Sequence, residues 1–77
     1  MPAASVGAEL LNEIERVSAK RERWKGYAQS PGMAVSCAPG IAMMTRSIER
    51  AKEAAQGDDP AEAIRALEDL RSYPEES

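Results

Sequence analysis

The stretch GDDPAEA at residues 57–63 sets both a turn of the chain and the start of a helix. Gly57 is a natural residue to follow a helix C-terminus. Asp59 is typical of an N-cap, Pro60 of the first helical position and Glu62 of the third, a capping box with Asp in place of Ser or Thr. The sequence therefore predicts that one helix ends at the glycine and that another begins at the proline.

Apolar residues recur at helical spacing on both sides of this boundary. The pattern predicts helices over about residues 5–28, 40–56 and 60–72, a loop at 29–39 and a frayed tail at 74–77. The predicted buried stripes are Leu10, Ile14, Val17, Arg21, Trp24 and Ala28, widened by Leu11; Ile41, Met44, Ile48, Ala51 and Ala55; and Ala63, Ile64, Leu67 and Leu70. We expect one small all-α domain, a helical hairpin with a short third helix packed across it.

Two Pro-Gly pairs mark the predicted loop. Pro31 with Gly32 is expected to stop the first helix. Pro39 favours an extended conformation at Ala38, because the proline ring clashes with a helical residue before it. These signals are the basis for predicting a non-helical connection.

Length and composition limit how this domain is stabilised. A chain of 77 residues buries only about 60% of the surface of its unfolded form. It has one Cys and no His, so neither an intrachain disulfide nor an ordinary zinc site can reinforce a thin core. Oligomerisation is the remaining route, and we expect a homo-oligomer.

Charge is unevenly distributed along the chain. The net charge of −3 argues against general DNA binding. Residues 16–25 nevertheless hold five bases against one acid, whereas residues 46–77 hold five bases against nine acids. A local anion-binding patch is therefore compatible with an acidic protein.

The N-terminal residues lack the basic and long apolar regions of a signal peptide. No stretch approaches the roughly 18 apolar residues of a membrane span. A lone cysteine fits a reducing compartment, so we expect a cytoplasmic protein with no membrane partner.

No enzymatic activity, metal or cofactor is expected. The usual general base is absent with His, and Cys37 would need an activating group from another element. As a packed loop residue, Cys37 needs no function. Asp58 and Asp59 lack the spaced oxygen ligands of a calcium loop, and capping already explains Asp59.

A candidate ligand site follows from the hairpin geometry, because the end of the first helix lies beside the start of the second. Cationic groups for phosphate, aromatic rings for stacking and free backbone N–H groups are the ingredients of a nucleotide site. The candidate residues are Arg23, Trp24, Lys25, Tyr27, Thr45 and Arg46, with residues 32–37 as backbone donors. In the alternative interpretation Trp24 anchors the hairpin core and Arg23 and Lys25 are solvated.

Other charged positions also allow more than one interpretation. Arg21 falls on the apolar stripe, where it either extends its charged end to solvent, pairs with an acid of a neighbouring subunit or meets a ligand in a central cavity. Arg46 with Glu49, and Glu49 with Lys52, stand at the spacing of helix neighbours.

The segments KRERWKGY and IAMMTRSIERAKEAAQGDDPAEAIRALEDLRSY resemble short helical accessory proteins of tailed bacteriophages and proteobacterial prophages. The resemblance covers roughly residues 9–73 and brings no enzymatic motif. It implies a phage gene expressed in the bacterial cytoplasm, where such proteins are often counter-defence factors.

Three functions are therefore in view. The sharpest is a sponge that sequesters a phosphate-bearing nucleotide second messenger. The alternatives are a protein–protein inhibitor of a host defence complex, such as a CRISPR effector, and a structural or regulatory phage component.

Overall fold

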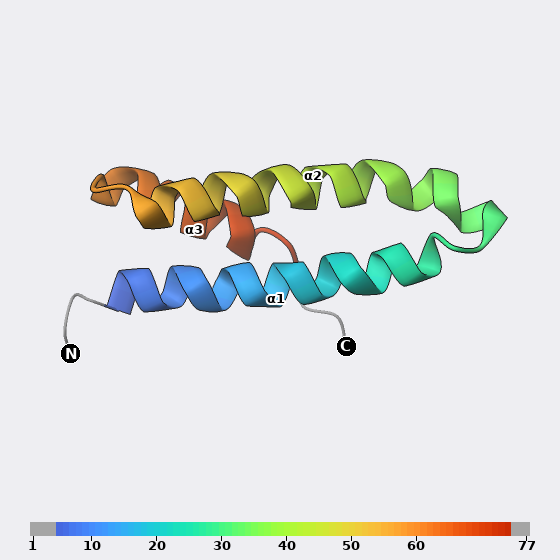
Figure 1. Ribbon diagram of the computed structural model, residues 1–77, viewed down its shortest axis with the longest axis horizontal. Helices are drawn as coiled ribbons and strands as arrows, with labels where there is room; N and C mark the ends of the chain where they lie inside the picture. The colour runs from blue at the N-terminus through green and yellow to red at the C-terminus, as the bar shows by residue number, and fades with distance from the viewer. Residues whose placement is uncertain (1–4, 75–77) are drawn as a thin grey trace.

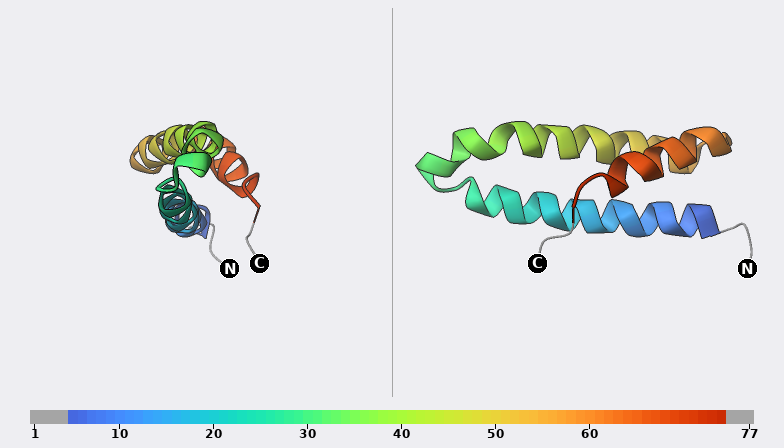
Figure 2. Two further views of the ribbon diagram at one scale, coloured as in Figure 1. Left: turned by 90° about the vertical axis from the view of Figure 1, so that its right-hand side faces the viewer. Right: turned by 180° about the vertical axis from the view of Figure 1, so that it is seen from behind.

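Three helices make up residues 5–74, the part of the chain that the structure describes (Figure 1). In this computed structural model α1 spans Ser5–Tyr27, α2 spans Pro31–Gln56 and α3 spans Pro60–Arg71, which confirms the all-α prediction. α1 and α2 form a long antiparallel hairpin, and α3 folds back onto one face of it (Figure 2). The molecule is elongated, with extents of 46 × 23 × 15 Å. The predicted frayed tail lies outside the described residues, except for Pro74.

The predicted loop at 29–39 is wrong, because α2 already begins at Pro31. Ser30 is its N-cap in extended conformation, and the Ser30 carbonyl accepts the N–H groups of Met33 and Ala34 at 2.9 and 3.0 Å. Proline is well suited to the first helical position, since its fixed φ is helical and its missing N–H would be unpaired there anyway. The Pro-Gly pair that was predicted to stop one helix instead starts the next.

Pro39 lies inside α2 without ending it. A proline within a helix removes the hydrogen bond to the carbonyl four residues earlier, here that of Val35. Val35 is 81% exposed, so water can reach that part of the helix. The cost of the proline is offset by packing on the opposite face, where Cys37 is buried and Gly40 contacts Trp24.

The core lies where all three helices meet. α1 contributes Leu10, Ile14 and Val17, α2 contributes Met44, Ile48 and Ala51, and α3 contributes Ala66, Leu67 and Leu70. Trp24, Ala54, Ala63 and Tyr73 pack against this cluster. Leu11 and Ile64, which were predicted in the stripes, are instead 57% and 45% exposed, and Ala55 is exposed as well. Each is adjacent to the buried arc of its helix, which is narrower than the sequence pattern suggested.

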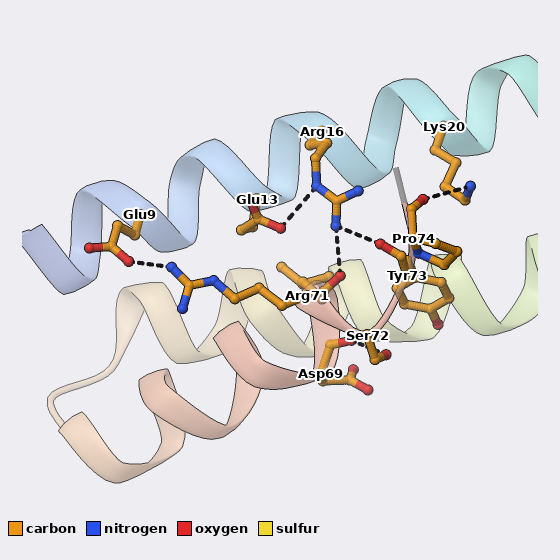
Figure 3. Close-up of polar contacts among 10 residues, drawn as sticks. Glu9, Glu13, Arg16, Lys20, Asp69, Arg71, Ser72, Tyr73 and Pro74 are labelled. Atoms are coloured by element: carbon orange, nitrogen blue, oxygen red, sulfur yellow. Dashed lines mark hydrogen bonds and ion pairs between the residues drawn. The ribbon is translucent and has the colours of Figure 1, made fainter. Parts of the chain in front are cut away.

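Polar contacts fix α3 at both of its ends, and Figure 3 shows those at the C-terminal end. At the start, the Asp59 side chain accepts the N–H of Ala61 at 2.9 Å, so Asp59 is the predicted N-cap. At the end, the Arg16 guanidinium donates to the carbonyls of Leu70 and Tyr73 at 3.0 and 2.9 Å. These donors satisfy carbonyls that a helix C-terminus leaves unpaired.

Trp24 of α1 lies close to Gly40 of α2 near the hairpin turn. A Cβ atom added to Gly40 would overlap Cζ3 of the Trp24 ring and lie 3.0 Å from Cε3. The absence of a side chain at residue 40 therefore allows the indole to approach the α2 backbone closely. A Cβ at Gly32, also within α2, would meet nothing within 4 Å.

We predict that Gly40→Ala lowers the melting temperature, whereas Gly32→Ala leaves it unchanged or raises it. Alanine gains up to about 1 kcal/mol over glycine in a helix interior, but overpacking costs about 1–3 kcal/mol, and only residue 40 suffers the overlap. Thermal denaturation followed by circular dichroism compares the two variants directly. Equal stabilisation by both substitutions would show that Trp24 does not need the close approach.

Candidate functional site

The structure divides the predicted ligand site rather than assembling it. Arg23, Lys25 and Tyr27 are exposed on the last turns of α1, and Lys25 lies 3.3 Å from the carboxylate of Glu22. Trp24 is partly buried against the core. The Lys20 ammonium lies 5.7 Å from the centroid of the Trp24 ring, within cation–π range. With Gly40 and Lys20 beside the indole, its geometry favours the core-anchor interpretation over stacking on a ligand.

Thr45 and Arg21 connect α1 to α2. The Thr45 hydroxyl donates to the Ile41 carbonyl at 2.8 Å and accepts from Arg21 Nη1 at 3.3 Å. Arg21 Nε is buried without a hydrogen bond, and its nearest carboxylate oxygen, on Glu22, is 3.8 Å away. Thr45 therefore has a structural role, because the hydrogen bond from Arg21 to its hydroxyl links α1 to α2.

The predicted backbone donors at 32–37 are also wrong, because this segment is helical. Pro31 has no N–H, and the N–H groups of Met33 and Ala34 already bond to Ser30. From residue 35 onward the N–H groups belong to the regular ladder of α2. Only the first-turn N–H of Gly32 is left over, too little for a phosphate cradle.

Arg46 lies in a different place, a groove between α2 and the end of α3. This groove, which we call the arginine groove, has a volume of about 180 Å³ and is lined by Met43, Arg46, Ser47, Arg50, Asp69 and Tyr73. Its floor is polar: the Ser47 and Tyr73 hydroxyls lie 2.9 Å apart in a hydrogen bond, and Ser47 is only 9% exposed.

Two unpaired guanidinium groups distinguish the arginine groove. Arg46 and Arg50 are one helical turn apart, and neither forms an ion pair or hydrogen bond with another residue in the range 5–74. Glu49, the expected partner of Arg46, lies 4.0 Å from Lys52 instead. Like charges at this spacing destabilise a helix by about 0.2–0.5 kcal/mol. An anion held between them would remove that repulsion and accept charge-assisted hydrogen bonds.

Sequence reasoning identified Arg46 but missed Arg50, Ser47 and Tyr73. The signal was present as two arginines four residues apart on a helix. It was obscured because Glu49 offered Arg46 a plausible partner, and because the position of Tyr73 depends on how α3 folds back.

The remaining chemistry is limited. Cys37 is a buried free thiol. Residues 5–74 contain no group of three or more His, Cys, Asp or Glu placed to hold a metal ion. Within the same residues, no helix has the length and apolar character needed to cross a membrane.

The chain matches no protein-family model, and no curated protein or solved structure is significantly similar to it.

We predict that the hydrogen bond between Ser47 and Tyr73 stabilises the floor of the arginine groove. Tyr73→Phe leaves the buried Ser47 hydroxyl without its partner and should cost about 1 kcal/mol or more of unfolding free energy. Ser47→Ala combined with Tyr73→Phe should cost less than the sum of the two single changes. Urea denaturation of all four proteins measures this coupling, and strict additivity would contradict it.

Proposed function

We propose that this protein is a non-enzymatic binding protein that holds a phosphate-bearing ligand in the arginine groove. The observation that carries the proposal is the pair Arg46 and Arg50, which line one groove without an ionic partner among the described residues. Planar guanidinium groups suit the oxygens of phosphate, to which each can donate two parallel hydrogen bonds. The Ser47 and Tyr73 hydroxyls supply further polar contacts beside them.

The size of the groove limits what part of a ligand it can take. Pockets for whole drug-sized ligands measure about 300–1,000 Å³, whereas this groove measures about 180 Å³. A phosphoryl group fits such a space, and the rest of a nucleotide would extend beyond it. The ligand class is therefore defined by its phosphate and not by its base.

This proposal keeps the nucleotide-sponge hypothesis but moves its phosphate contacts from the hairpin turn to the groove. Sequestration requires that the protein bind its ligand at fixed stoichiometry, and it requires no chemical step. It is therefore compatible with a chain for which we propose no catalytic group. A phage counter-defence role in a bacterial cytoplasm is the setting that the sequence resemblance implies, and it stays a prediction.

One observation favours the protein-inhibitor alternative. Met33, Val35 and Met43 are 46%, 81% and 54% exposed on the first half of α2, and flexible methionines suit adaptable protein contacts. Under that alternative the chain captures one host protein stoichiometrically and binds no nucleotide.

We predict that Arg46→Gln with Arg50→Gln weakens phosphate-ligand binding by about tenfold or more, because each lost charge-assisted hydrogen bond is worth about 1.5–3 kcal/mol. Isothermal titration calorimetry with inorganic phosphate and a panel of linear and cyclic nucleotides measures the loss. The same change should leave thermal stability unchanged or slightly higher, since it removes a like-charge pair.

Lys52→Gln with Arg65→Gln is the matched control. It removes the same charge from exposed helix positions that are paired with Glu49 and Glu62. If the control variant weakens ligand binding equally, the loss of affinity is an effect of net charge and not of the groove. Binding that survives the loss of both groove arginines would place the site elsewhere, and no binding across the panel would shift the proposal to the protein inhibitor.

A further inference from the structure

The crevice between α2 and α3 continues beyond the arginine groove. α3 runs back along the second half of α2 (Figure 2), and a second hollow of about 210 Å³ lies between these two helices. We call it the acidic hollow; it is lined by Arg50, Glu53, Ala54, Gly57, Asp59 and Glu62. Arg50 also lines the arginine groove, so the two hollows adjoin at its side chain. Together their volumes fall within the range of about 300–1,000 Å³ typical of pockets that hold whole drug-sized ligands.

The arginine groove contains an acid as well as two arginines. Asp69, in the last turn of α3, lines the groove together with Arg46 and Arg50. None of these three residues forms an ion pair with another residue in the range 5–74. Two guanidinium groups against one carboxylate leave the groove with a net charge of +1. The groove therefore balances one negative charge of a ligand, and not two.

The acidic hollow makes the rest of the crevice unfavourable for further negative charge. Its carboxylates belong to Glu53, Asp59 and Glu62, against the single cation Arg50. Glu62 pairs with Arg65 and Asp59 caps α3, whereas Glu53 has no ionic partner in the part of the chain that the structure describes. An ionised carboxylate only accepts hydrogen bonds, so this hollow suits the N–H and O–H groups of a base or a sugar. A second phosphate group placed there would meet like charge.

We infer, on the basis of the proposed function, that the ligand of the arginine groove is a phosphodiester whose neutral part lies in the acidic hollow. A phosphodiester carries one negative charge, which matches the charge of the groove. A phosphomonoester carries about −1.5 to −2 at pH 7, and a polyphosphate carries more, so part of the ligand charge would face Asp69 without an added cation. Asp69 is therefore the residue that sets the specificity for a diester.

The expected preference for a diester is moderate, because the groove is open to water. Arg46 and Arg50 are exposed, and Asp69 is only partly buried. Water and salt weaken the interaction between exposed charges. We therefore expect each extra ligand charge beside Asp69 to weaken binding by about fivefold, the effect of one unit charge at contact distance in water.

Nucleotides that share a base but differ in their phosphate test this preference. Isothermal titration calorimetry in buffer without divalent cations compares cyclic 3′,5′-AMP, 5′-AMP and ATP, and the series is repeated with guanine as the base. The native protein should bind the cyclic diester about fivefold or more tightly than the monoester, and the triphosphate least tightly. Asp69→Asn removes the repelling charge, so the affinity for 5′-AMP should rise by about fivefold or more. The affinity for the cyclic diester should rise less, and the preference for the diester should shrink.

Glu68→Gln is the matched control for Asp69→Asn. It removes the same charge from the neighbouring residue of α3, which lines neither the arginine groove nor the acidic hollow, and it should leave the preference unchanged. Circular dichroism checks that both variants keep the native helix content. The comparison of ligands on the native protein does not depend on any variant.

The outcomes separate this inference from the proposed function. If the native protein binds the monoester or the triphosphate as tightly as the diester, and Arg46→Gln with Arg50→Gln abolishes that binding, the inference is wrong and the proposed function stands. An equal effect of Asp69→Asn and Glu68→Gln on the preference overturns the role of Asp69. If neither a nucleotide nor inorganic phosphate binds, the inference and the proposed function fail together.

Discussion

The contact between the Arg16 guanidinium and the C-terminal carbonyls of α3 holds the short helix onto the hairpin. A helix of 12 residues is marginal in isolation, and its last carbonyls carry unpaired lone pairs and partial negative charge. The Arg16 guanidinium supplies both hydrogen-bond donors and a positive charge there. Its own Nε lies 3.0 Å from the Glu13 carboxylate. Arg16 also bonds to the Tyr73 carbonyl. It thereby positions Tyr73, whose hydroxyl bonds to Ser47 at the floor of the arginine groove.

The sequence predicted correctly those features that depend on interactions between residues close together in the chain. Asp59, Pro60 and the following apolar spacing determine the start of α3 through hydrogen bonds and dihedral angles within a few residues. Pro31 is different, because the same Pro-Gly pair can end a preceding helix or begin a following one. The choice is made by packing around residues 37–40, where Cys37 is buried and Trp24 needs the bare backbone of Gly40. Such tertiary contacts are not visible in a short sequence window.

The candidate site shows the same division between local and tertiary information. Arg23, Trp24, Lys25 and Tyr27 lie within five residues of sequence, but a helix distributes neighbouring residues around its axis, and only some of them share a face. The arginine groove instead joins residues one turn apart on α2 to residues from the end of α3. The groove can be recognised only when the path of the chain after Arg71 is known, and that path depends on the contacts of Arg16 and Lys20.

Stability should therefore decrease from the α3 end of the molecule towards the hairpin turn. Three helices and most buried apolar side chains meet at the α3 end, and Arg16, Lys20 and Arg71 add polar contacts there. Near the turn, two helices depend on the contact between Trp24 and Gly40, on Cys37, and on the bond from Arg21 to Thr45. Regions with few buried apolar contacts open with the least free energy, so the part of the hairpin near the turn should open before the end that α3 covers. The arginine groove lies between these two regions, with one side on the firmly held end of α3 and the other on the stretch of α2 that leads towards the turn.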